Sequence, residues 1–246
     1  MIFKENIIGY SMPSAKSQRN GPARPRARRL SPPERRTQLL ACALRVFARR
    51  GLGEARHAEI AKEAGVSIAT VFFYFPTRTD LVKAVLDEVE RFYCAMAERI
   101  HERDLPAPQV LFDHAIAFSD SVDTHPDYAR VWLDWSTAIR DEVWPRYLHF
   151  QGYVVKIVEK TIRRGQREGT LAAEVDPEDE AQLLFGSAHI IAQMKFTRQS
   201  PKRLKRFLQT VVRIATGGLP PDEVLSAGVV PSRPEVSLAR LRKPAR

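Results

Sequence analysis

Residues 57–82 constrain this chain most, because their pattern is that of two short helices joined by a tight turn. Ile60 and Ala64 lie at helical spacing and give the first helix one apolar face. Gly65 then suits a turn that needs a positive φ, and Ser67 is a favoured N-cap for the second helix. Such a pair presents its second helix to the major groove of DNA. The stretch therefore predicts a helix-turn-helix.

The charge distribution favours a polyanionic partner. The chain has 39 Lys and Arg against 29 Asp and Glu, and residues 1–36 alone carry nine basic and two acidic side chains. Residues 1–30 are rich in Pro, Ser, Gly and Arg, which predicts a flexible basic arm. This arm is interpreted as reaching into the DNA minor groove, the alternative being a solvated tail that aids solubility. The candidate minor-groove residues are Arg24, Arg26, Arg28 and Arg29.

Composition and length place the chain among ordinary globular proteins. Its 246 residues are 44% hydrophobic and 28% charged, and no run approaches the roughly 20 apolar residues of a membrane span. The N-terminus lacks a charged-then-apolar signal pattern, so we expect no membrane association and a cytoplasmic protein, whether translation starts at Met1 or Met12. Cys42 and Cys94 lie in apolar helical patterns and are expected to be core residues.

No motif indicates an enzyme. The His, Cys and carboxylate residues show no metal-ligand spacing, and there is no Gly-rich phosphate loop or nucleophile elbow. We therefore expect no catalytic residues, no metal and no cofactor.

Periodicity predicts an all-α chain with four parts: a flexible basic arm over 1–30, a helix-turn-helix domain over 31–78, a helical regulatory and dimerisation domain over 79–216 and a flexible tail over 217–246. Caps, prolines and apolar stripes predict helices over 31–50, 57–64, 67–75, from Thr77 or Thr79 to 101, 110–123, 128–140, 144–168, 177–198 and 201–215.

The second helix of the helix-turn-helix offers several groups to DNA, although spacing alone leaves open which of its aromatic side chains points outward. The alternative role of Tyr74 is that of a core ring. The alternative role of His57 and of Arg78 is that of a solvated surface charge or a cap. Hydroxyls for phosphates or base edges come from Ser67, Thr70 and Tyr74, apolar contacts to thymine methyl groups from Ile68, Ala69 and Phe73, and phosphate contacts from His57 and Arg78.

These motifs resemble a known family. Phe-Ala-Arg-Arg-Gly at 47–51, Ile-Ala-Lys-Glu-Ala-Gly-Val-Ser at 60–67 and Thr-Val-Phe-Phe-Tyr-Phe-Pro-Thr-Arg-Thr-Asp-Leu-Val at 70–82 are similar to the N-terminal domain of TetR-family transcriptional regulators. Residues 28–32, 57–58 and 131–145 are similar to the LuxR/HapR-type branch of quorum-sensing master regulators. That branch usually has Asn where this chain has Phe73, so base readout and target preference at this position are open.

The resemblance implies a dimer in which the last two long helices form a four-helix bundle with a second subunit, the alternative being their burial within one subunit. It also favours an apolar cavity between helices, with a plain aromatic core as the alternative. A small apolar effector in that cavity is a candidate partner, the alternative in this branch being regulation through protein abundance. The fourth helix would then carry the effector's signal to the DNA-binding unit. The candidate cavity residues are Phe92, Met96, Phe112, Phe118, Trp132, Trp135 and Tyr147.

Taken together, the sequence predicts a homodimeric transcriptional regulator that binds double-stranded operator DNA at pseudo-palindromic sites. The alternative is a protein that coats DNA without sequence preference by means of its basic arm. The two hypotheses predict different affinities, because a regulator binds its operator roughly 10³-fold or more tightly than other DNA, whereas a coating protein binds both equally.

Overall fold

Nine α-helices and no strand make up the part of the chain that this computed structural model describes, residues 30–215. The predicted all-α fold is therefore confirmed. The helices are α1 (Pro32–Arg50), α2 (His57–Ala64), α3 (Ile68–Tyr74), α4 (Arg78–His101), α5 (Ala107–Thr124), α6 (Pro126–Ser136), α7 (Trp144–Arg167), α8 (Pro177–Phe196) and α9 (Pro201–Ala215).

Local capping explains where several helices begin. The Ser31 hydroxyl accepts the Glu34 N–H while the Glu34 carboxylate accepts the Ser31 N–H, and Thr77 and Asp80 make the same reciprocal pair before α4. Between α2 and α3, Gly65 takes φ +65°, a left-handed conformation that suits glycine. Each of these signals is local in sequence, which is why the predicted starts agree with the observed ones.

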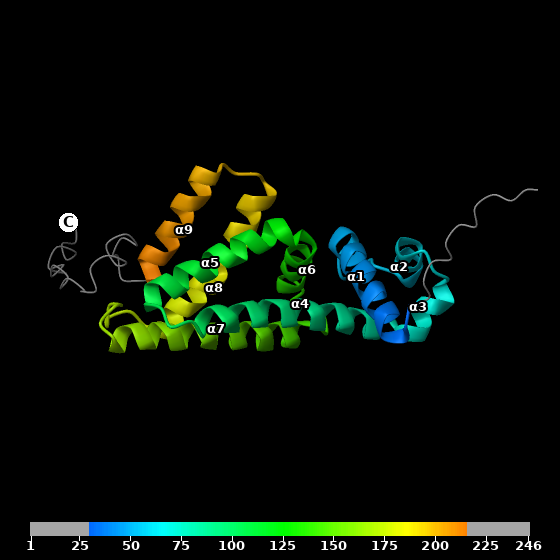
Figure 1. Ribbon diagram of the computed structural model, residues 1–246, viewed down its shortest axis with the longest axis horizontal. Helices are drawn as coiled ribbons and strands as arrows, with labels where there is room; N and C mark the ends of the chain where they lie inside the picture. Colours follow the sequence, from blue (N-terminus) through cyan, green and yellow to red (C-terminus); the bar gives the residue numbers. More distant parts are fainter. Residues whose placement is uncertain (1–29, 216–246) are drawn as a thin grey trace, which may run out of the picture.

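The molecule is elongated, with α1, α2 and α3 gathered at one end (Figure 1). The long helix α4 begins at this end and runs the length of the molecule beside α7. Helices α5, α8 and α9 pack together at the far end, and α6 lies against α1 where the two halves meet. Helix α4 is therefore one link between the three-helix unit and the larger bundle, and α6 is a second.

Helix α6 is shorter than the predicted 128–140 helix. It begins at Pro126 and ends at Ser136, because the hydroxyls of Ser136 and Thr137 donate to the carbonyls of Leu133 and Asp134 at 2.7 and 3.0 Å and help to end the helix. The Trp135 indole N–H also donates to the Val143 carbonyl at 3.0 Å and holds the following turn against the helix.

The described helices also lack the features of a membrane span and of a metal site. None of the helices within residues 30–215 is long and apolar enough to cross a membrane. Over the same residues, no three His, Cys, Asp or Glu side chains gather as a metal site would require.

Gly165 marks the tightest packing of α7. A Cβ at this position would lie 2.7 Å from the Ala107 Cβ and from the Leu171 side chain, whereas a Cβ at Gly152 of the same helix would meet nothing within 4 Å. We expect Gly165→Ala to lower the free energy of unfolding by about 1–3 kcal/mol through overpacking. The matched Gly152→Ala should raise it by about 0.5–1 kcal/mol, since alanine favours a helix interior. Urea denaturation followed by circular dichroism measures both, and an unchanged Gly165→Ala midpoint would contradict this account.

Candidate DNA interface and interior cavity

Helix α3 is anchored by one face and leaves the other open. Val71 within it and Phe75 directly after it are fully buried against the core of the three-helix unit. On the opposite side the Phe73 side chain is 78% exposed, and Ile68 and Phe72 are about half exposed. Residue spacing alone does not decide which aromatic side chain of α3 points outward, and the structure identifies it as Phe73.

The polar candidates of α3 lie at its N-terminal end. The Ser67 hydroxyl caps the helix by accepting the Thr70 N–H at 3.2 Å, and it lies 2.8 Å from the Thr70 hydroxyl. Ala69 is exposed beside them, and Tyr74 is partly buried with its ring edge-to-face against Phe73. These groups thus share one end of the molecule, and their contacts with DNA stay a prediction.

His57 and Arg78 each have protein partners in this structure. The buried His57 ring lies 2.8 Å through Nε2 from the Phe75 carbonyl and stacks on Phe72 at 4.1 Å between ring centroids. Arg78 donates through Nη2 to the carbonyls of Leu52 and Gly53, the latter at 2.8 Å. His57 thereby ties α2 to the end of α3, and Arg78 holds the α1–α2 loop. A phosphate contact by either residue stays a prediction.

Several basic side chains of the three-helix unit are paired with acids. Glu63 on α2 binds Arg45 and Arg49 of α1 at 2.9 and 2.8 Å, and Glu59 binds Arg50 at 2.8 Å. Helix α3 itself carries no acidic or basic residue. Arg24, Arg26, Arg28 and Arg29, the predicted minor-groove residues, lie outside the described residues.

Asp134 of α6 joins the bundle to the three-helix unit. Its carboxylate accepts the Leu52 N–H at 2.5 Å. The neighbouring Gly51 has φ +82°, and a Cβ there would lie only 3.2 Å from the same carboxylate. Arg78 holds the loop from the other side, so the α1–α2 loop is fixed by α6 and α4 together.

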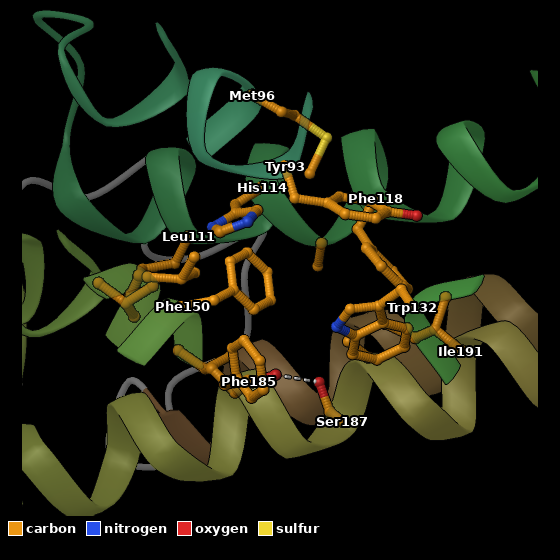
Figure 2. Close-up of a pocket in the computed structure, with 15 residues that line it drawn as sticks. Tyr93, Met96, Leu111, His114, Phe118, Trp132, Phe150, Phe185, Ser187 and Ile191 are labelled. Atoms are coloured by element: carbon orange, nitrogen blue, oxygen red, sulfur yellow. Dashed lines mark hydrogen bonds between the residues drawn. The ribbon is translucent and has the colours of Figure 1, made fainter. Parts of the chain in front are cut away.

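An interior cavity of about 60 Å³ lies between α4, α5, α6, α7 and α8 (Figure 2). Three of its predicted residues, Met96, Phe118 and Trp132, line it. The full lining comprises Tyr93, Met96, Leu111, His114, Ala115, Phe118, Trp132, Phe150, Val154, Val158, Leu184, Phe185, Ser187, Ala188 and Ile191.

The other four predicted cavity residues do not line the cavity, and for them the prediction is corrected. Phe92 packs instead against Tyr128 and His125, with ring centroids 4.5 and 4.9 Å away. Phe112 is partly buried against the core. Both directly neighbour a residue that does line the cavity, and adjacent positions of a helix point about 100° apart.

Trp135 and Tyr147 each lie three residues along their helix from a residue that lines the cavity, Trp132 on α6 and Phe150 on α7. Their ring centroids are 5.6 Å apart, and the Trp135 ring stacks on Phe150 at 5.5 Å. Both rings are buried, so for these two residues the structure shows the aromatic core that was the alternative interpretation.

Two histidines meet at the edge of the cavity. His101 Nε2 lies 2.8 Å from His114 Nδ1, and His101 Nδ1 lies 2.7 Å from the Thr161 hydroxyl. Burial lowers the pKa of His101 to about 3 and that of His114 to about 4, so both rings are neutral near pH 7. His114 lines the cavity, whereas His101 borders a surface cleft between α4 and α7.

Sequence reasoning missed Tyr93, His114, Phe150 and Phe185, because the cavity residues were chosen by residue type and not by the helix face on which they lie. A signal was present: Leu111, His114, Ala115 and Phe118 follow the i, i+3, i+4, i+7 spacing of one helix face. Asp134 was missed as well. Its partner Leu52 is 82 residues away, and no local pattern connects the two.

Comparison with known proteins gives a consistent result. Residues 39–85 match the family described as bacterial regulatory proteins, tetR family. The HTH-type transcriptional regulator LuxR of Vibrio harveyi is 38% identical over 168 residues, covering 68% of this chain and 82% of that protein.

Solved structures show the same fold. The transcriptional regulator FadR from Bacillus subtilis, solved in complex with stearoyl-CoA, has a TM-score of 0.59 at 21% identity, covering 74% of this chain and 98% of that one. The ketosteroid transcriptional regulator KstR2 of Mycobacterium tuberculosis has a TM-score of 0.60 at 18% identity, covering 76% and 95%.

The buried histidine pair predicts loss of stability in mild acid. Both folded-state pKa values lie below the ordinary value of 6.5, so below pH 6.5 the unfolded chain takes up protons that the folded chain does not. This contribution to stability is complete above pH 6.5 and is lost as the pH falls toward 4. We expect the free energy of unfolding to decrease by up to about 3 kcal/mol per pH unit between pH 6.5 and 5.

Urea denaturation at several pH values measures this slope. Replacing both rings together, by His101→Phe and His114→Phe, should flatten it, whereas His149→Gln at an exposed position of α7 should leave it as in the wild type. A wild-type stability that stays constant from pH 7 to 5 would contradict the prediction.

Proposed function

Because this chain belongs to the TetR family of bacterial regulatory proteins, we propose that it acts as a cytoplasmic homodimer that binds a pseudo-palindromic operator through α3. The family consists of DNA-binding transcriptional regulators rather than enzymes, so the chain is a DNA-binding transcriptional regulator. The observation that carries the finer proposal is the exposed face of α3, where a Phe side chain is 78% exposed. Folding alone gains nothing from leaving such a ring in water.

The chemistry of α3 favours a particular mode of base recognition. Its exposed side chains are apolar or hydroxyl-bearing, with no amide, acid or base for bidentate hydrogen bonds to base edges. An exposed Ile68 and Phe73 suit the C5-methyl groups that thymine presents in the major groove. We therefore propose that the half-sites are read largely through thymine methyl groups, with Ser67, Thr70 and Tyr74 as hydrogen-bonding partners.

Phosphate contacts would come from outside α3. The basic arm over residues 1–30 is the proposed source, with Arg24, Arg26, Arg28 and Arg29 in the minor groove. His57 and Arg78 keep a proposed secondary role at the backbone. Because each neutralised phosphate releases condensed counterions, affinity should fall steeply with salt.

Helices α8 and α9 are the proposed dimer interface. Leu183 and Ile190 of α8 and Ile214 of α9 are about half exposed, and Gly186, on the same face of α8 as Leu183 and Ile190, has open space around its Cα. Apolar side chains around a small residue allow another helix to approach closely. A second copy of this chain, packing α8 and α9 into a four-helix bundle, would cover them.

The interior cavity is the proposed effector site. A solved protein of this fold, the B. subtilis FadR, was obtained with stearoyl-CoA, so the fold accommodates small molecules. An effector changes operator affinity only if it binds the DNA-competent and incompetent states unequally. Helices α4 and α6 both connect the cavity to the three-helix unit and would transmit the difference. The likeness to LuxR favours a role in cell-density-dependent transcription, as repressor or activator.

The alternative is a protein that coats DNA without sequence preference. Retention of a randomised duplex library at near-physiological salt, followed by sequencing, separates the two. An enriched pseudo-palindrome supports the operator proposal, whereas salt-sensitive retention without enrichment supports the alternative.

We expect Phe73→Ala to weaken binding to the selected operator, and replacement of the contacted thymines by deoxyuridine to weaken wild-type binding by about fourfold for each methyl group removed. The two losses should not add, because each removes the same contact. Leu148→Ala serves as the control, since Leu148 is a half-exposed apolar residue of α7, away from α3. Fluorescence anisotropy with labelled duplexes measures all combinations. Equal affinity for thymine and deoxyuridine operators would refute methyl readout.

A further inference from the structure

The cavity is apolar with only a few polar atoms, and no Asp, Glu, Lys or Arg side chain lines it. The polar side-chain groups of its lining belong to Tyr93, His114, Ser187 and the indole N–H of Trp132. The Ser187 hydroxyl already donates to the Leu184 carbonyl at 2.7 Å, within its own helix (Figure 2). A molecule in the cavity would therefore find hydrogen-bonding capacity at Tyr93, at His114 and at the Trp132 indole N–H, and of these only Tyr93 and His114 can accept a hydrogen.

Tyr93 carries an orphaned hydroxyl. Its side chain is 4% exposed, and the hydroxyl has no hydrogen-bond partner among the described residues. Ser121 lies near it and donates its own hydrogen to the Phe118 carbonyl at 2.6 Å, so the lone pairs of the Ser121 oxygen stay available to the Tyr93 hydroxyl. A buried polar group without a partner is costly, and such groups often mark a site for water or ligand.

The hydrogen bonds around His114 determine whether its second ring nitrogen, Nε2, is a hydrogen-bond donor or acceptor. The Thr161 hydroxyl has two acceptors within reach, the Ile157 carbonyl at 3.5 Å and His101 Nδ1 at 2.7 Å, and we assign its single hydrogen to the carbonyl. Thr161 then accepts from His101 Nδ1–H, and His101 Nε2 in turn accepts from His114 Nδ1–H. A neutral imidazole has one N–H and one lone pair, so this network assigns a lone pair to His114 Nε2.

We propose that the cavity binds a small, uncharged, mainly aromatic molecule that carries one hydroxyl or N–H group and donates its hydrogen to His114 Nε2. This inference rests on the proposed function only in treating the cavity as an effector site. His114 Nε2 makes no hydrogen bond to any residue within 30–215, so the site is open to such a donor.

The shape and charge of the lining select this class of ligand. Trp132 meets Phe118 and Phe185 edge-to-face, with centroids 5.3 and 6.3 Å apart, and a further aromatic ring can continue this packing. The cavity of about 60 Å³ is smaller than the roughly 150 Å³ of a cavity that binds benzene, so a single ring enters only as the flexible Met96 side chain moves, and larger ring systems are excluded. A carboxylate would find no cationic side chain in the lining, because the neighbouring histidines are neutral.

Three probes of similar size test the proposal by calorimetry on the full chain without DNA: 4-methylphenol, p-xylene and 4-methylbenzoate. We expect 4-methylphenol to bind about tenfold more tightly than p-xylene, because only the phenol donates a hydrogen bond, and 4-methylbenzoate to bind most weakly. Equal binding of phenol and xylene, tightest binding of the benzoate, or binding of none would overturn the proposal. The experiment uses no operator, so such a failure leaves the proposed DNA-binding function untouched.

Variants locate the hydrogen bond. His114→Phe should abolish the preference for 4-methylphenol over p-xylene, whereas Ser187→Ala, at a hydroxyl satisfied by its own helix, should keep it. Nitrogen NMR of histidine-labelled wild-type protein gives a readout that does not depend on how the variants fold. The resonance of a non-protonated His114 Nε2 should shift on adding 4-methylphenol and stay in place with p-xylene. A protonated Nε2 in the free protein would overturn the assigned direction of the hydrogen bonds.

Discussion

Burial of the two tryptophans of α6 sets the position of the junction between the bundle and the three-helix unit. Trp132 lines the cavity, and Trp135 stacks on Phe150 and donates to the Val143 carbonyl. A short helix held by two large buried rings has little freedom to slide or rotate. Asp134 lies between them in sequence and accepts the Leu52 N–H. Within one turn of α6, Trp132, Trp135 and Asp134 thus contact the cavity, the bundle core and the loop of the three-helix unit, respectively.

The fold was largely predictable from sequence, because the signals that begin and end its helices are local. Ser31 with Glu34 and Thr77 with Asp80 act over three residues, so their effect is visible without knowledge of the rest of the chain. The end of α6 was not predictable in this way. The hydroxyl bonds of Ser136 and Thr137 are local, but the Trp135 indole also reaches the Val143 carbonyl, which requires the folded turn.

The site was predictable in kind but not in detail. Chemistry identified the residues of α3 that can meet DNA, and the structure shows which of its aromatic side chains points outward. For the cavity, the rotation of α4 decides whether Phe92 or Tyr93 faces inward, and that rotation depends on contacts from several other helices. The contact between Asp134 and Leu52 joins residues 82 positions apart. Long-range contacts of this kind have no signature in a single sequence.

The exposed face of α3 has a thermodynamic consequence for how this protein occupies DNA. In the free molecule, water hydrates the side chains of Ile68, Phe72 and Phe73. Binding that seats α3 in a matching major groove removes that water and so carries a negative change in heat capacity, whereas loose electrostatic attachment leaves the rings hydrated. In the proposed mode of binding, the preference for an operator over other DNA therefore varies with temperature, and the exposed apolar side chains of α3 determine that dependence.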